Sequence, residues 1–210
     1  MSAETRTSYH HGSLREELIT ACVALIEAEG IGAVSLRQVA RTAGVSPGAP
    51  YHHFADRSAL LAAISVRGYE MLETELRAAR DGAATPARAL GAMIESYVWF
   101  ARDHPAYVQL MLRPELAKPE KHPDAQEAGD RAIAMLTGVV LDCQREGCAP
   151  PGDPVPLVTT IWALAVGIAT LWLDGPLEEQ CVSFGTTPEE LTRRITALLE
   201  GLLAKAPGSM

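Results

Sequence analysis

The chain has 210 residues, of which 48% are hydrophobic and 5% aromatic, and its formal net charge is −8 at neutral pH. This size allows one large hydrophobic core or two small ones, and the negative charge argues against indiscriminate binding to nucleic acid. The four cysteines lack the paired spacing of a zinc site, and the N-terminus lacks the pattern of a signal peptide. We therefore expect a cytoplasmic protein with reduced thiols, no metal and no cofactor.

The first helix is expected to follow a polar, flexible N-terminal tail, residues 1–12. Ser13 and Glu16 fit a capping box, in which each side chain bonds the other residue's backbone amide. Apolar side chains then recur at helical spacing until Gly30, which ends the pattern. The sequence thus predicts one amphipathic helix before the first internal turn.

Residues 35–54, SLRQVARTAGVSPGAPYHHF, predict two short helices joined by a tight turn. Ser35 and Gln38 fit a second capping box, so a helix is expected to begin directly after the serine. Gly44 can adopt the positive φ that ends many helices. This layout is typical of a helix-turn-helix, a motif that places its second helix in the major groove of DNA.

The residues after this turn suit contact better than packing. Ser46 is a good N-cap and Pro47 fits the first helical position, so a second helix is expected here. Small side chains follow, and Tyr51 and His52 can donate hydrogen bonds to phosphate oxygens. The first sixty residues carry five arginines against six carboxylates, so attraction to DNA must come from the placement of charges. Phe54 is expected in the core.

The same stretch resembles the tetracycline-repressor-like (TetR) family of transcriptional regulators over about residues 13–72. The matching positions are Ser35, Val39-Ala40, Gly44-Val45-Ser46, Gly48, Tyr51-His52-His53-Phe54 and the basic Arg57. Pro50 departs from the family pattern, because it replaces a bulky aliphatic residue and removes an amide. The resemblance implies a DNA-binding domain at 13–72, whose expected contacts are Ser35, Arg37, Ser46, Pro47, Gly48, Ala49, Pro50, Tyr51, His52 and Arg57. The alternative is a three-helix core in which Tyr51 simply packs.

Beyond this region the sequence predicts further helices and no strands. Asp56 is expected to cap a long helix that bridges two domains, and proline recurs at the first helical position at 85–86, 104–105 and 187–188. We expect an all-α fold of about nine helices, with a three-helix DNA-binding domain and a larger helical domain at 81–206. The family resemblance implies that the larger domain binds a small-molecule effector and forms a homodimer.

A run of twenty uncharged residues, 154–173, reaches the length of a membrane span. Its prolines, its threonines and its acidic flanks argue against insertion. We expect instead a helix that is buried on all sides, in the core or across a dimer interface. The residues expected in that interface are Trp162, Leu191, Ile195, Leu198, Leu199 and Leu202.

Large amphipathic and thioether side chains gather between residues 93 and 111, where they are expected to line an adaptable, mainly apolar effector cavity. Stripes of this kind also occur in ordinary cores. Trp162, Val166 and Gly167 resemble the Trp-x-x-x-His-Gly element of the TetR branch with a WHG-type C-terminal domain, with Val166 where His is expected. The residues expected to bind the effector are Met93, Tyr97, Trp99, Phe100, His104, Tyr107, Met111 and Trp162.

Together these features favour a sequence-specific DNA-binding regulator, most simply a repressor released from a palindromic operator by a small molecule. One alternative is a helical enzyme that uses His104 or His122 with a cysteine or a carboxylate. No nucleophile elbow, HExxH motif or Walker loop supports it, so we expect no catalytic residues. A second alternative is a helical interaction protein without DNA binding.

Overall fold

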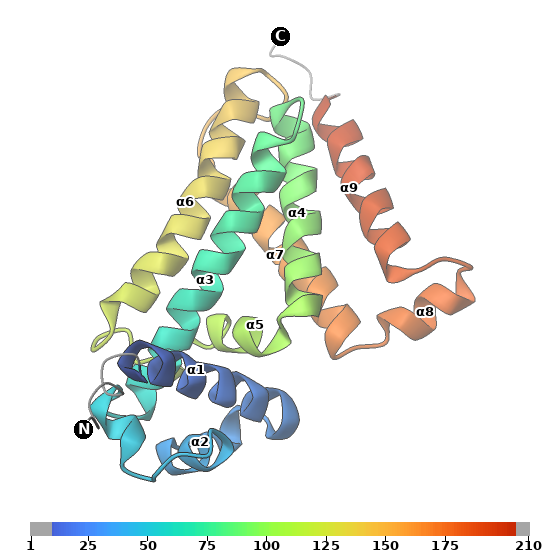
Figure 1. Ribbon diagram of the computed structural model, residues 1–210. Coiled ribbons are helices and arrows are strands. Elements are labelled where there is room, and N and C mark those ends of the chain that lie inside the picture. The colour runs from blue at the N-terminus through green and yellow to red at the C-terminus, as the bar shows by residue number, and fades with distance from the viewer. Residues whose placement is uncertain (1–9, 205–210) are drawn as a thin grey trace, which may run out of the picture. The chain divides into compact units, whose positions relative to one another are not determined.

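The computed structural model describes residues 10–204, and all regular structure in that part of the chain is helical, as predicted (Figure 1). Nine α-helices and three short 3₁₀ helices follow one another there. The α-helices are α1 (His10–Glu29), α2 (Leu36–Thr42), α3 (Arg57–Asp81), α4 (Pro86–Asp103), α5 (Pro105–Met111), α6 (Pro123–Arg145), α7 (Val155–Leu173), α8 (Leu177–Ser183) and α9 (Pro188–Ala204). The 3₁₀ helices are η1 (Ile31–Ala33), η2 (Ala49–His52) and η3 (Pro114–Leu116).

The described chain forms two compact units that alternate along the sequence. The first unit comprises residues up to 68 together with 106–127, and the second comprises 69–105 and the residues from 128 onward. Helix α3 therefore contributes its first half to one unit and its second half to the other. The division by function into residues 13–72 and 81–206 remains a prediction.

Helix α1 begins at His10, inside the segment that the sequence predicts as a flexible tail; residues 1–9 lie outside the described range. The predicted start at Ser13 is wrong, because that residue lies within the helix. A glycine in a helix interior costs only about 1 kcal/mol relative to alanine, so Gly12 need not stop the helix. Cys22 is fully buried on α1, as expected of a core residue.

The first helix of the helix-turn-helix forms as predicted. The Ser35 hydroxyl accepts a hydrogen bond from the Gln38 amide at 3.1 Å and so caps α2. Gly44 has a φ of +70°, and the Val45 amide reaches back to the Ala40 carbonyl at 3.0 Å. This pattern is a Schellman motif, in which a left-handed glycine closes the helix end.

In the second unit, α4 packs against both α7 and α9 (Figure 1). Leu90, Ile94 and Phe100 of α4 are almost completely buried, as is Ile161 of α7. By length and composition α7 is the one helix in residues 10–204 that could also cross a membrane. Length and composition alone are weak evidence for a membrane span. Only 28% of its apolar window is buried within the chain. The chain itself thus covers one side of α7, and burial on all sides would need a partner.

Candidate functional site

The second helix of the predicted helix-turn-helix is shorter and tighter than expected. In place of an α-helix from Pro47, the chain makes a turn and then the single 3₁₀ helix η2. Pro50 explains the difference, because it has no amide to donate to the Ser46 carbonyl and its ring would clash with that carbonyl in an α-helix. The observed bonds join residues three apart instead, from the Ala49 amide to Ser46 at 3.0 Å and from the Tyr51 amide to Gly48 at 3.2 Å.

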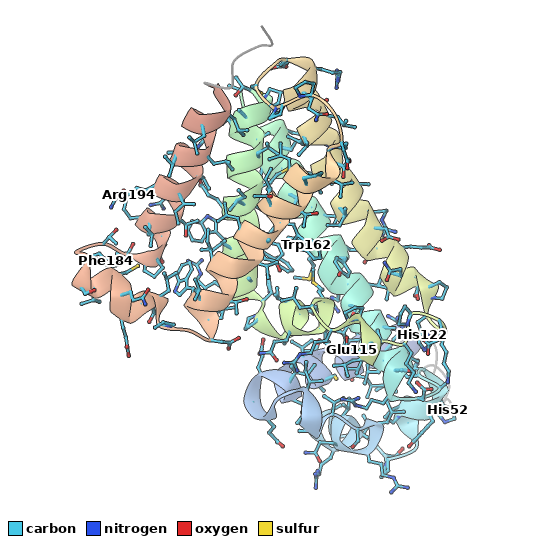
Figure 2. The ribbon with its side chains drawn as sticks, turned by 180° about the vertical axis from the view of Figure 1, so that it is seen from behind. His52, Glu115, His122, Trp162, Phe184 and Arg194 are labelled. Carbon is cyan, nitrogen blue, oxygen red and sulfur yellow. The ribbon has the colours of Figure 1, made fainter. Side chains whose placement is uncertain are left out.

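We call residues 46–52 the recognition turn. Its surface is made of small side chains and two hydrogen-bonding rings: Ser46, Pro47 and Gly48 are exposed, as are Tyr51, at 53%, and His52. His52 is labelled in Figure 2. Ala49 is half-buried. Backbone and ring donors on a surface with few bulky side chains can approach a phosphate or a base edge closely. On α2, Ser35 and Arg37 are exposed as well.

Two residues beside this surface point inward. Pro50 is buried, so the expectation that it contacts DNA needs correction: its ring packs and its carbonyl accepts the amides of His53 and Phe54. Phe54 is 3% exposed, as expected for a core residue, and the Arg15 guanidinium lies over its ring. The contact with Arg15 links Phe54, which follows the recognition turn, to α1.

Arg57 has a structural role that the sequence reasoning missed. Its guanidinium donates to the carbonyls of Val34 and Ile31 at 2.9 and 2.8 Å, and so ties the start of α3 to the segment around η1. The phosphate contact expected of Arg57 therefore competes with two structural bonds. The same cation opposes the effect of burial on Cys22, and burial prevails, raising the pKa of that thiol to about 12.

Asp56 caps α3, as predicted. Its carboxylate accepts the Ala59 amide at 2.9 Å and the Ser58 hydroxyl at 2.5 Å. The bond from the Ser58 hydroxyl, followed by that from the Ala59 amide, lowers the pKa of Asp56 to about 2. His122 lies 3.4 Å from the Ser58 oxygen.

These three side chains do not make a catalytic triad. The serine gives its one proton to the aspartate, so the imidazole can only donate to the serine oxygen and cannot act as its base. The enzyme alternative based on His122 thus gains nothing from the geometry.

The residues expected to bind an effector divide between the two units. Met93, Tyr97 and Phe100 are buried on α4 in the second unit, where burial raises the pKa of the Tyr97 hydroxyl. Tyr107 and Met111 lie in the first unit and pack against Gly68. A Cβ added at Gly68 would lie 3.0 Å from an atom of each side chain.

The other expected effector residues make contacts near the surface. Trp99 meets Trp172 edge to face with ring centroids 5.6 Å apart, and the Arg102 guanidinium lies 5.6 Å from both rings. His104 lies against Phe100, with centroids 4.9 Å apart. Trp162 is 45% exposed on α7 (Figure 2), which suits a contact with a partner better than a cavity wall.

Large apolar side chains are exposed on α7 and α9. We call Trp162 and Leu171 of α7 and Leu198 and Leu202 of α9 the outer apolar residues; the two leucines of α9 are 64% and 62% exposed. Leu191, Ile195 and Leu199 are half-buried beside them. The sequence reasoning missed Val182 and Phe184, which are exposed around α8; Phe184 is labelled in Figure 2. Where such groups form one contiguous patch, they mark an interaction surface.

A helix-turn-helix in one unit and a larger helical second unit are the features of a DNA-binding regulator of the all-α class, and comparison with known proteins agrees. The family profile described as "Tetracyclin repressor-like, C-terminal domain" matches residues 90–199, more than half of the chain, and "Bacterial regulatory proteins, tetR family" matches residues 18–64. The chain belongs to the tetR family of bacterial regulatory proteins. Members of this family are transcriptional regulators and not enzymes; they bind operator DNA and, through the C-terminal domain, small-molecule effectors.

Individual relatives fit this assignment. The HTH-type transcriptional regulator BetI of Rhizobium meliloti (strain 1021) is 36% identical over 80 residues, which span 38% of this chain and 39% of that relative. A solved protein of unknown function from Rhodococcus sp. RHA1 is 32% identical with a TM-score of 0.76, covering 95% of this chain and all of its own. The structure of AibR in complex with isovaleryl coenzyme A and operator DNA shares the fold, with 18% identity, a TM-score of 0.70, and coverage of 90% and 98%. The assignment to the branch with a WHG-type domain remains a prediction.

Proposed function

We propose that the protein is a cytoplasmic, homodimeric repressor that binds a short palindromic operator through the recognition turn of each subunit and is released by a small molecule. The observation that carries this proposal is the chemistry of the recognition turn. Small exposed residues and two ring donors are held in place by the buried Pro50 and Phe54. A surface with no role in binding would have no need of this anchoring.

The proposed DNA contacts are the exposed members of the expected set. Arg37 and Tyr51 serve phosphates, and the backbone around Gly48 can approach closely because no side chain intervenes. Pro50 positions the turn instead of touching DNA, and Arg57 holds the backbone that precedes α2. The exposed residues of this proposal are Ser35, Arg37, Ser46, Pro47, Gly48, Tyr51 and His52.

The proposed dimer buries the outer apolar residues against a second copy. Four large apolar side chains on two helices would add stability to any interface, at about 1.5 to 3 kcal/mol for each fully buried side chain. A two-fold dimer also explains why the operator should be palindromic, with half-sites about 34 to 36 Å apart on one face of the duplex.

The proposed effector is a small apolar or amphipathic molecule bound in the region 85–175. Met93, Tyr97 and Phe100 supply thioether and ring surface there, and Tyr97 adds a polar tip. Typical couplings of about 1 to 3 kcal/mol would lower the DNA affinity roughly 5- to 150-fold. AibR supports this only by likeness of fold, since its complex contains both an acyl coenzyme A and operator DNA.

Selection of bound fragments from a random DNA pool tests the proposal. We expect enrichment of one sequence with inverted symmetry, and release of the enriched DNA by those compounds of a diverse library that also stabilise the protein against heat. The matched control is Tyr51→Ala, which removes an exposed ring donor of the recognition turn. Failure of the wild type to enrich any sequence contradicts DNA recognition. Enrichment that no stabilising compound reverses contradicts only the effector response.

A further inference from the structure

Two cysteines meet at the C-terminal end of α6. The Gly147 amide donates to the Gln144 carbonyl at 3.2 Å, and the Cys148 amide donates to the Cys143 carbonyl at 2.9 Å. Gly147 has a φ of +74°. These bonds form a Schellman motif, whose geometry commonly brings the side chains at the positions of Cys143 and Cys148 into contact. An interaction with the Cys148 thiol is accordingly one of the causes that raise the pKa of Cys143.

The two thiols differ in access to solvent. Cys143 is fully buried, whereas Cys148 is only partly covered. Burial, and then the hydrogen bond that the protonated Cys143 thiol donates to Cys148, raises the pKa of the Cys143 thiol to about 12. Because the thiolate is the reactive form of cysteine, Cys143 is a poor nucleophile toward solutes. Cys148 is the member of the pair that a dissolved oxidant can reach.

The loop beyond the pair is held against the same helix end. The Gln144 side-chain amide donates to the carbonyl of Pro150 at 2.8 Å and lies 3.3 Å from that of Gly152. Cys148 therefore sits between two anchors, the Schellman bonds before it and the Gln144 side chain after it. This arrangement keeps its sulfur beside that of Cys143.

Helix α8 ends in the same motif with only one thiol. The Thr186 amide donates to the Cys181 carbonyl at 3.0 Å, the Gly185 amide donates to Val182 at 3.2 Å, and Gly185 has a φ of +66°. Thr186 stands where α6 has Cys148, and Cys181 is buried. The chain thus contains its own control for the effect of the second thiol.

We propose that Cys143 and Cys148 form an oxidation site, at which a hydroperoxide converts the two thiols into an intramolecular disulfide. The Cys148 thiolate attacks one peroxide oxygen, the O–O bond breaks, and the protein gains a sulfenic acid while the other oxygen leaves protonated. For hydrogen peroxide this product is water. The Cys143 sulfur then attacks the sulfenic sulfur, the S–O bond breaks, the S–S bond forms, and the hydroxide leaves as water with the Cys143 proton.

The two thiols together supply the two electrons that reduce the peroxide. A disulfide joins Cβ atoms about 3.5 to 4.5 Å apart, and the side-chain contact that is common at these two positions of a Schellman motif favours such a separation. In a reducing compartment such a bond is transient and responsive to oxidants, not a structural link. The new bond would constrain the segment that leads from α6 into α7.

The test treats the reduced full-length protein with graded hydrogen peroxide, alkylates the remaining thiols and maps the peptides by mass spectrometry. We expect a linked peptide pair containing Cys143 and Cys148, the loss of two free thiols, and their return on adding a dithiol reductant. Cys148→Ser should remove the product, and Cys181→Ser should leave it unchanged.

A further variant separates the two chemical steps. Cys143→Ala should stop the reaction at the Cys148 sulfenic acid, which a cyclic 1,3-diketone traps. Four free thiols in the oxidised wild type, or equal conversion of Cys148 to sulfinic acid with and without Cys143, would overturn the proposal. If Cys143→Ala does not fold, Cys148→Ser and Cys181→Ser decide the matter. The experiment involves no DNA, so its outcome is independent of the proposed repressor function.

Discussion

The recognition turn and the outer apolar residues are both exposed, yet their chemistry differs. The recognition turn presents small residues, a hydroxyl, a phenol and an imidazole, whereas the residues of α7 and α9 present an indole and three leucines. The first set can form hydrogen bonds with phosphates and bases. The second set lowers the free energy mainly when its apolar surface is removed from water. Exposure alone therefore does not identify a partner; the chemistry of the exposed groups does.

The two regions also differ in how they are held. The recognition turn is a tight turn followed by a short 3₁₀ helix, and it is held by its own backbone bonds and by the buried Pro50 and Phe54. The outer apolar residues project from regular helices whose other sides form the core of the second unit. We therefore expect substitutions near the turn to affect folding and binding together, and substitutions on the helices to affect association alone.

The largest effect is expected from Leu198→Glu combined with Leu202→Glu. Both side chains are exposed in the single chain, so the helical circular dichroism should persist. Four leucines lost from a symmetric interface should raise the dimer dissociation constant at least about 100-fold. Sedimentation velocity measures the change, with Ala197→Glu as control on a side of α9 roughly 100° away. An intact double-variant dimer contradicts the assignment of these residues.

Arg57→Ala should destabilise the first unit by about 3 kcal/mol, since it removes two charged hydrogen bonds to buried backbone carbonyls. Arg57→Lys should recover only part of this, because a lysine cannot span both acceptors in the same plane. Urea unfolding gives the values, and the exposed Arg37→Ala should stay within about 0.5 kcal/mol of the wild type. Unchanged stability of Arg57→Ala, with a reduced salt dependence of DNA binding, would restore its predicted phosphate contact.

Asp56→Ala should cost about 1 kcal/mol through loss of the α3 cap. The folded pKa of about 2 lies below the ordinary value near 3.9, so the charged cap stabilises the fold above about pH 4 and this part is lost as the pH falls through 2. Asp56→Asn should keep the cap bonds and lose this pH dependence. The two pKa values set a range of roughly pH 5 to pH 2 for this test. If the unfolding free energies of the wild type and of Asp56→Asn change in parallel over that range, the role of the charge is contradicted.

The smallest effects are expected on the salt dependence of DNA binding. Arg37→Ala should lower the slope of log affinity against log salt by about one unit if it neutralises one phosphate. Tyr51→Phe removes a neutral donor, so it should weaken binding to all sequences alike without changing that slope. Titrations of the selected DNA at several salt concentrations separate the two. A slope that falls with Tyr51→Phe and not with Arg37→Ala would reverse these assignments.

Much of the fold was predictable because the controlling signals are local. The Ser35 cap and the positive φ of Gly44 follow from residue type and spacing, and both occur where the sequence placed them. The shortened second helix could also have been predicted from the sequence. An α-helix that starts at Pro47 needs a first hydrogen bond from the amide of residue 50, and Pro50 has no amide to donate.

The side-chain roles were harder to predict because they depend on distant neighbours. Arg57 bonds to residues 23 and 26 positions earlier, a distance that no periodicity reveals. Tyr107 and Met111 share a sequence cluster with Met93 yet pack in a different unit against Gly68. The exposure of Leu198 and Leu202 likewise depends on which side of α9 meets α4, and the apolar pattern alone does not distinguish a core side from a partner side.

The central claim is that the recognition turn binds DNA and that the outer apolar residues bind a second copy of the chain. Its most direct test is the stoichiometry of the complex with the selected DNA, measured by sedimentation for the wild type and for Leu198→Glu combined with Leu202→Glu. We predict that two wild-type chains bind one symmetric site. The double variant should lose affinity for the symmetric site but keep its affinity for an isolated half-site. A single wild-type chain bound at full affinity, or equal losses on the symmetric site and the half-site, would contradict the claim.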